Sequence, residues 1–182
     1  GRDTVYLTVV DDSGLAVSFI NSLFAQFGSG IVTARTGVTL HNRGQGFVLT
    51  PGHPNCIAPG KRPLHTLVPA MALKGGRPHL AFGVMGGAYQ AMGHAYVISN
   101  IADYGMDPQE ALDAARIFFD GDTLAAEEGI SDACAAGLRA LGHDVVRAEA
   151  PWGGGQLVAI DPATGLLTGA SDPRKDGCAL GY

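Results

Sequence analysis

Segments with the pattern of a β-strand lie at both ends of this chain, and segments with helical features lie between them. Thr4 to Val10 alternates and is rich in β-branched residues, so it predicts a strand. Asp11 to Gly14 is a turn cluster, and Leu15 to Phe24 is predicted to be the hairpin partner of that strand. An order with strands first, helices in the middle and strands last predicts an α+β fold whose sheets and helices form separate layers.

Local signals predict the remaining elements. A helix is expected from about Ala88 to Tyr104, because apolar residues recur there with a period of about 3.6 residues. Gly153 to Gly155 is expected to be a flexible turn. The other expected elements are one or two short strands within Ile31–Leu40, an irregular segment Pro51–Pro69, a hairpin of Ala70–Leu73 with His79–Val84, helices from Asp107 to about Arg116 and from Ser131 to Gly142, and strands at Asp144–Glu149, Gln156–Ile160 and Leu166–Ala170.

The composition excludes several classes of protein. The chain has 182 residues, 46% hydrophobic and 16% charged, which predicts a folded domain rather than intrinsic disorder. This length fits a single domain, residues 1–182. The formal net charge is −5, so no nucleic-acid partner is expected. Apolar stretches fall short of the ~18 residues of a membrane helix, so no membrane partner is expected either.

Metal and cofactor signatures are absent from the sequence. The cysteines Cys56, Cys134 and Cys178 lie far apart and form no CxxC pair. His53 and Cys56 are of ligand type but lack a second pair, so no metal site is expected. Gly60-Lys61-Arg62 lacks the glycine spacing and the hydroxyl residue of a phosphate-binding loop. We therefore expect no cofactor.

Thr4, at the start of the first predicted strand, is a candidate nucleophile. A threonine hydroxyl attacks poorly unless a base removes its proton. Cleavage of the peptide bond before Thr4 would free its α-amine, whose reference pKa of about 8 leaves part of it neutral at physiological pH. One residue would then be both nucleophile and base. Threonine also starts many strands without any such role, so this position alone leaves both interpretations open.

Four motifs, in the same order, resemble the small subunit of γ-glutamyltranspeptidases. They are Thr4–Gly30, Ala58–Leu64, Gly83-x-x-Gly86-Gly87 and Gly169–Arg174, and the resemblance extends from Thr4 to Tyr182. It implies an N-terminal-nucleophile hydrolase with an αββα four-layer sandwich, of which this chain forms part and a large subunit from the same precursor forms the rest. It also implies self-cleavage between Asp3 and Thr4, with residues 1–3 as a residual pro-segment.

The resemblance also implies roles for individual residues. Thr4 would be nucleophile and base, Gly86 and Gly87 would form an oxyanion hole through their backbone N–H groups, and Ser22 would hydrogen-bond the nucleophile. The implied activity is that of a γ-glutamyltransferase or glutathione hydrolase, which cleaves a γ-glutamyl amide through a threonine ester and passes the acyl group to water or an amine. The implied assembly is a heterodimer or a dimer of such heterodimers.

Five positions depart from the substrate-binding pattern of the family. Phe24 replaces an Asn that holds the substrate α-amino group, Arg43 replaces a Gln, and Gly46 replaces an Asp that pairs with the same ammonium. His65 and Thr66 replace a Ser-Ser pair that binds the α-carboxylate. An arginine without the acid makes a pocket less suited to a cation. The alternatives are therefore the same chemistry on an oxamate-like or glutaryl-cephalosporin-like amide, or a structural or binding relative without catalysis.

Two further expectations concern what lies outside this chain. Any targeting signal would lie upstream of Gly1, so the cytoplasm and the periplasm both remain open. This chain alone is expected to expose a large apolar face where the large subunit packs.

Overall fold

The computed structural model describes residues 4–182, which form nine strands and three α-helices. The strands are β1 (Thr4–Val10), β2 (Ala16–Ser22), β3 (Ala70–Lys74), β4 (Arg77–Met85), β5 (Ile117–Phe119), β6 (Leu124–Ala126), β7 (Val145–Arg147), β8 (Gly154–Ile160) and β9 (Leu167–Ser171). The helices are α1 (Gln90–Ala102), α2 (Pro108–Asp113) and α3 (Asp132–Ala140), with 3₁₀ turns at Arg43–Gly46 and Gly87–Tyr89. The α+β prediction is confirmed.

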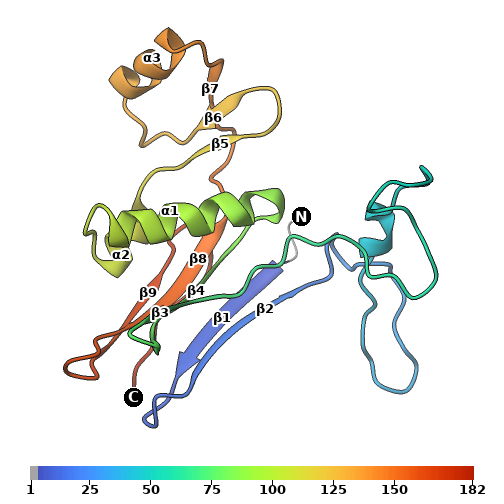
Figure 1. Ribbon diagram of the computed structural model, residues 1–182, viewed down its shortest axis with the longest axis horizontal. Coiled ribbons are helices and arrows are strands. Elements are labelled where there is room, and N and C mark those ends of the chain that lie inside the picture. Colours follow the sequence, from blue (N-terminus) through green and yellow to red (C-terminus); the bar gives the residue numbers. More distant parts are fainter. Residues whose placement is uncertain (1–3) are drawn as a thin grey trace.

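A four-stranded antiparallel sheet with the order β3-β4-β8-β9 lies at the centre of the fold. Helices α1 and α2 cover one face of this sheet, and the β1–β2 hairpin packs against the other (Figure 1). Strands β5, β6 and β7 form a separate small sheet that packs with α3. The central part therefore has three layers, in the order helices, sheet and hairpin, as expected for part of an αββα sandwich.

The main apolar core lies between the central sheet and its helices. Residues Leu80 to Val84 of β4 are all buried, because both faces of this strand are covered. The fully buried apolar side chains of this cluster are Leu80, Phe82, Val84, Tyr89, Val97, Leu112, Leu157 and Ala170. Within residues 4–182, none of the helices has the length and apolar character that crossing a bilayer requires.

The β1–β2 hairpin has two unlike faces. Alternation along β1 turns Tyr6 toward the central sheet, where its ring occupies the space above Gly83. A Cβ atom on Gly83 would lie 2.3 Å from Cε2 of Tyr6, so glycine at this position lets β1 approach β4 closely. Val5, Leu7 and Val9 point the other way and are 47–63% exposed.

The two long hairpins and α1 confirm the predictions for these segments, but two predictions in the loops are wrong. Residues 31–40 contain only a single bridge between Val32 and Thr39, because the turn closed by the Gly37 N–H and the Thr33 carbonyl leaves too few residues for a ladder. Residues 153–155 are buried rather than a flexible turn, and Gly154 and Gly155 belong to β8. Strands β5 and β6 were not expected.

Candidate functional site

Thr4 and Ser22 lie opposite each other at the open end of the β1–β2 hairpin. The antiparallel register pairs the two residues, and Thr4 Oγ1 donates a hydrogen bond of 3.0 Å to Ser22 Oγ. Ser22 Oγ also accepts the backbone N–H of Phe24 at 3.0 Å. The Ser22 hydroxyl is therefore held from the loop side while it contacts Thr4.

Gly86 and Gly87 follow β4 directly and lead into α1. Their φ angles are +140° and +61°, a backbone range that glycine adopts far more readily than other residues. A Cβ atom on Gly86 would also lie 2.9 Å from Cα of Gly153, so the available space requires glycine there. No hydrogen bond within residues 4–182 uses the N–H of Gly86 or Gly87, which leaves both donors available to a ligand.

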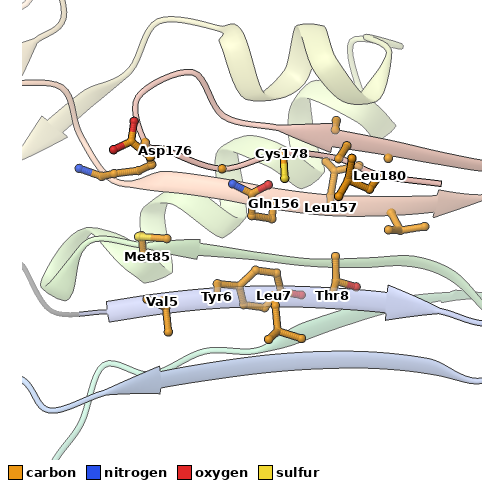
Figure 2. A pocket seen from close by; sticks show the side chains of 16 residues that line it. Val5, Tyr6, Leu7, Thr8, Met85, Gln156, Leu157, Asp176, Cys178 and Leu180 are labelled. Atoms are coloured by element: carbon orange, nitrogen blue, oxygen red, sulfur yellow. The ribbon is translucent and has the colours of Figure 1, made fainter. Parts of the chain in front are cut away.

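The hydroxyl pair and the diglycine lie at the same end of the sandwich. Figure 2 shows Met85 of β4 beside the first residues of β1, and Figure 1 places the start of β1 near the start of α1. Tyr6 of β1 contacts Gly83 of β4. Thr4 precedes Tyr6 by two residues and Gly86 follows Gly83 by three, and from this contact both lie toward the same end of the sandwich.

Arg43 lies over the aromatic ring of Phe24, with 5.4 Å between its Cζ atom and the ring centroid. Phe24 has φ = +78°, a region in which a residue with a side chain is strained. The Arg43 side chain is only 7% exposed, and burial lowers the pKa of its guanidinium. A hydrogen bond joins the loop that contains Phe24 to the segment that contains Arg43, because Asn42 Oδ1 accepts the N–H of Ala25 at 3.0 Å.

The other three predicted substrate residues are less closely connected to this centre. Gly46 is exposed at the end of the first 3₁₀ turn, His65 is exposed and Thr66 is half-buried. Within residues 4–182, no hydrogen bond joins any of them to Thr4. Their segment is tied to the start of α1, because Val68 donates its N–H to Gln90 Oε1 at 3.2 Å. The predicted cleavage residue Asp3 lies outside the described residues.

A buried network of four charged side chains lies behind the diglycine. Arg116 pairs with Asp172 at 2.6 Å, and Arg174 pairs with Glu127 at 2.5 Å and with Asp172 at 3.2 Å. Burial alone would raise the pKa of Glu127, but hydrogen bonds from Arg174 and from the Trp152 N–H bring it below its ordinary value. This network is not predictable from a local sequence pattern, although the Gly169–Arg174 motif contains two of its members, Asp172 and Arg174.

This network holds the segment against which the diglycine packs. Arg116 Nη1 donates to the carbonyl of Trp152 at 2.6 Å, and the Trp152 ring stacks on that of Tyr89 with 6.1 Å between centroids. Tyr89 ends the 3₁₀ turn that begins at Gly87, and Gly153 lies directly against Gly86. The diglycine turn is therefore packed against the ring of Trp152 through Tyr89 and against the backbone of Gly153 through Gly86.

Two pockets border the start of β1. An open pocket of about 490 Å³ is lined by Ser22 and by residues of the 38–41 loop, including His41. A smaller pocket of about 260 Å³ lies between β1 and residues 175–180, and none of the predicted site residues lines it (Figure 2). Residues 4–182 contain no group of three or more His, Cys, Asp or Glu side chains that could hold a metal ion.

The chain is similar to known proteins along its whole length. A family model described as Gamma-glutamyltranspeptidase matches residues 1–182. The oxamate amidohydrolase proenzyme of Klebsiella pneumoniae is 44% identical over 189 residues, which cover 99% of this chain and 36% of the relative. The glutathione hydrolase-like YwrD proenzyme of Bacillus subtilis is 39% identical over 189 residues, which cover 100% of this chain and 36% of the relative.

A solved structure matches as well. The cephalosporin acylase from Bacillus halodurans superposes with a TM-score of 0.90 and 40% identity, over 97% of this chain and 34% of that chain. The chain thus spans about a third of the length of these relatives.

Proposed function

Because the chain belongs to the γ-glutamyltranspeptidase family, we propose that it is the catalytic small subunit of an autoprocessed amidohydrolase and acyltransferase. The enzyme cleaves the amide bond of a small molecule and transfers the acyl group from Thr4 to water or to an amine. The observation that carries the proposal is the 3.0 Å hydrogen bond between Thr4 and Ser22, at the end of the sandwich where Gly86 and Gly87 lie.

The first half of the reaction forms an ester on Thr4. Cleavage of the Asp3–Thr4 bond converts the nitrogen of Thr4 into a free amine. Thr4 Oγ1 attacks the amide carbonyl carbon while this amine takes the hydroxyl proton, and an electron pair moves onto the carbonyl oxygen. The N–H groups of Gly86 and Gly87 stabilise this oxyanion; the loss of one such donor costs about 3–4 kcal/mol in a transition state.

The second half releases the acyl group. The C–N bond breaks as the α-ammonium of Thr4 gives its proton to the leaving nitrogen, which leaves the acyl ester. Water or an acceptor amine then attacks the ester carbon and gives a proton to the α-amine; the bond from this carbon to Thr4 Oγ1 breaks, and the α-ammonium returns the proton to Oγ1, which regenerates Thr4. No metal or redox group enters this proton balance.

The proposal is tested by a substrate panel and by the mass of the mature protein. Glutathione, a γ-glutamyl anilide, oxamate and a glutaryl-cephalosporin are assayed with the full-length protein, because the relatives' names include glutathione hydrolase and oxamate amidohydrolase. Turnover of any of them, together with a fragment that begins at Thr4, supports the proposal. An uncut precursor that turns over none of them favours the alternative of a relative without catalysis.

The outer face of the β1–β2 hairpin supports a large-subunit partner. This face consists of Val5, Leu7, Val9, Val17 and Phe19, all 42–63% exposed. A contiguous apolar surface of this kind is typical of an interface. Since the relatives are about three times as long as this chain, we propose that the rest of the precursor covers the face and supplies the fourth layer.

Ser22→Ala is expected to lower kcat by about 10-fold and to leave KM nearly unchanged. The serine hydroxyl contacts the nucleophile rather than the substrate, so its loss frees the Thr4 side chain to rotate away from the attacking position. Steady-state kinetics of the mature enzyme measure the effect. Ser13→Ala, in the exposed turn of the same hairpin, is the control. Equal kinetics of the Ser22 and Ser13 variants would contradict the assigned role.

A further inference from the structure

We infer that Arg43 selects the acyl group by binding a carboxylate that the substrate carries on its acyl side. The inference rests on the proposed function, since it takes Thr4 as the point of attack. It assigns a specificity role to a side chain that does not take part in the bond-breaking steps.

The first observation is that Arg43 is a buried cation without an acidic partner. The ion pairs within residues 4–182 involve Arg116, Arg147 and Arg174 but not Arg43. Within residues 4–182, the guanidinium has the Phe24 ring as a cation–π partner but no hydrogen-bonded acceptor and no carboxylate. Burying a cation without an anion costs several kcal/mol, so this position calls for an anion from elsewhere.

A comparison with Arg174 supports the same conclusion. Burial opposes the charge of Arg174, but hydrogen bonding to Glu127 raises its pKa above the ordinary value. Arg43 experiences burial alone, which lowers its pKa. The fold therefore compensates one buried arginine internally and leaves the other to be compensated by a ligand or a partner.

The second observation is that Arg43 is linked to the nucleophile by three successive contacts. Arg43 lies 5.4 Å from the Phe24 ring centroid, the Phe24 N–H donates to Ser22 Oγ at 3.0 Å, and Ser22 Oγ accepts from Thr4. Phe24, whose φ is +78°, stands between Ser22 and the guanidinium of Arg43 in this series of contacts. The inference therefore takes the far end of a short acyl group that reacts at Thr4 to reach Arg43.

The shape of the guanidinium indicates which kind of anion it binds. A guanidinium presents a planar set of donors that matches a carboxylate with two parallel hydrogen bonds. A γ-glutamyl group carries its α-carboxylate at the end of the acyl chain. A glutaryl group carries the same carboxylate without the α-amine. Neither Arg43 nor the Phe24 ring offers an ammonium group an acidic partner, so recognition by Arg43 requires the carboxylate and not the amine.

The test uses three anilides and the full-length mature protein. The glutaryl anilide carries the carboxylate without the amine, the γ-glutamyl anilide carries both, and the pentanoyl anilide carries neither. Arg43→Gln is expected to lower the ratio of kcat/KM for the glutaryl to the pentanoyl anilide by about 10- to 100-fold, mainly through KM, as expected for the loss of a charged hydrogen-bond pair. Arg77→Gln, the same change at an exposed arginine at the far end of β4, is the control and should keep the ratio.

The outcomes separate this inference from the proposed function. An unchanged ratio in Arg43→Gln, with normal wild-type turnover, overturns the inference and leaves the proposed function standing. A wild-type protein that turns over none of the anilides or panel amides overturns the proposed function itself. If Arg43→Gln does not mature, Arg43→Lys keeps the charge without the planar donors and should lower the ratio in part. An equal loss on the glutaryl and pentanoyl anilides in Arg43→Lys overturns the inference, because it assigns the anion to the rest of the precursor.

The γ-glutamyl group carries the same carboxylate as the glutaryl group, with the α-amine added, so Arg43→Gln should lower the γ-glutamyl to pentanoyl ratio as well.

Discussion

Replacement of Thr4 by alanine is expected to leave the full-length precursor uncut and to abolish amide turnover. The Thr4 side chain supplies the oxygen that attacks both the Asp3–Thr4 bond and the substrate. The adjacent Ser22 hydroxyl cannot replace it, because Ser22 lies within the chain and has no free α-amine to act as its base. Loss of a covalent nucleophile lowers kcat by as much as about 10⁶-fold in well-studied hydrolases. The mass of the purified protein reports cleavage, and an anilide assay reports turnover.

Two further variants make this test specific. Thr8→Ala removes the same hydroxyl from the same face of β1 without touching the site, and it should be cut and should turn over substrate. Thr4→Ser keeps an attacking oxygen and should be cut slowly. Normal cleavage of the Thr4→Ala precursor would contradict the proposal.

Asp172→Ala is expected to lower the free energy of unfolding by about 3–5 kcal/mol, the usual effect of leaving a buried ion without its partner. The carboxylate has no exposed side-chain surface and accepts from Arg116 at 2.6 Å, from Arg174 at 3.2 Å and from the Gly155 N–H at 2.9 Å. Its removal leaves the buried Arg116 guanidinium with the carbonyl oxygens of Trp152 and Leu112 but without an anion, while Arg174 keeps Glu127. Denaturant unfolding of the full-length protein measures the loss.

The control for this variant is Asp161→Ala, at a carboxylate that only stabilises its own exposed turn. A double variant, Arg116→Met with Asp172→Leu, removes both charges of this pair and should regain part of the lost stability, because Arg116 is then no longer a buried cation without an anion, while Arg174 keeps its pair with Glu127. Equal unfolding curves for Asp172→Ala and the wild type would show that the network contributes little to stability.

The fold was largely predictable from the sequence where local signals were strong. The N-terminal hairpin shows alternation and a turn cluster, and helix α2 begins at Pro108, directly after the capping residue Asp107, whose side chain accepts the N–H groups of Gln109 and Glu110. Strands β5 and β6 have three residues each, too short for a period to be detected, and besides pairing with each other they depend on β7, which pairs with β6 from about twenty residues further along the chain. The predicted end of α2 at Arg116 was too late, because Ala114 is extended and Arg116 is drawn into the buried network.

The candidate site was predictable only in part, for a similar reason. The pairing of Thr4 with Ser22 follows from the register of one hairpin, so the sequence is sufficient to suggest it. The support behind the diglycine depends on Trp152 meeting Tyr89 and on Asp172 meeting Arg116, contacts between segments far apart in the chain. No local pattern reports such contacts. Gly153 was misread for this reason: its lack of a side chain serves close packing, with Met85 O only 2.6 Å from where a Cβ would stand.

The contact between Tyr6 and Gly83 also bears on the position of the nucleophile. Tyr6 lies two residues after Thr4 in β1, and the packing of its ring on the backbone of Gly83 sets the distance between this strand and the central sheet. A methyl group at residue 83 would push the Tyr6 ring away from the central sheet and would move Thr4 Oγ1 with it. We therefore expect a change in side-chain size at residue 6 or residue 83 to alter the direction from which Thr4 attacks, although neither residue takes part in the reaction.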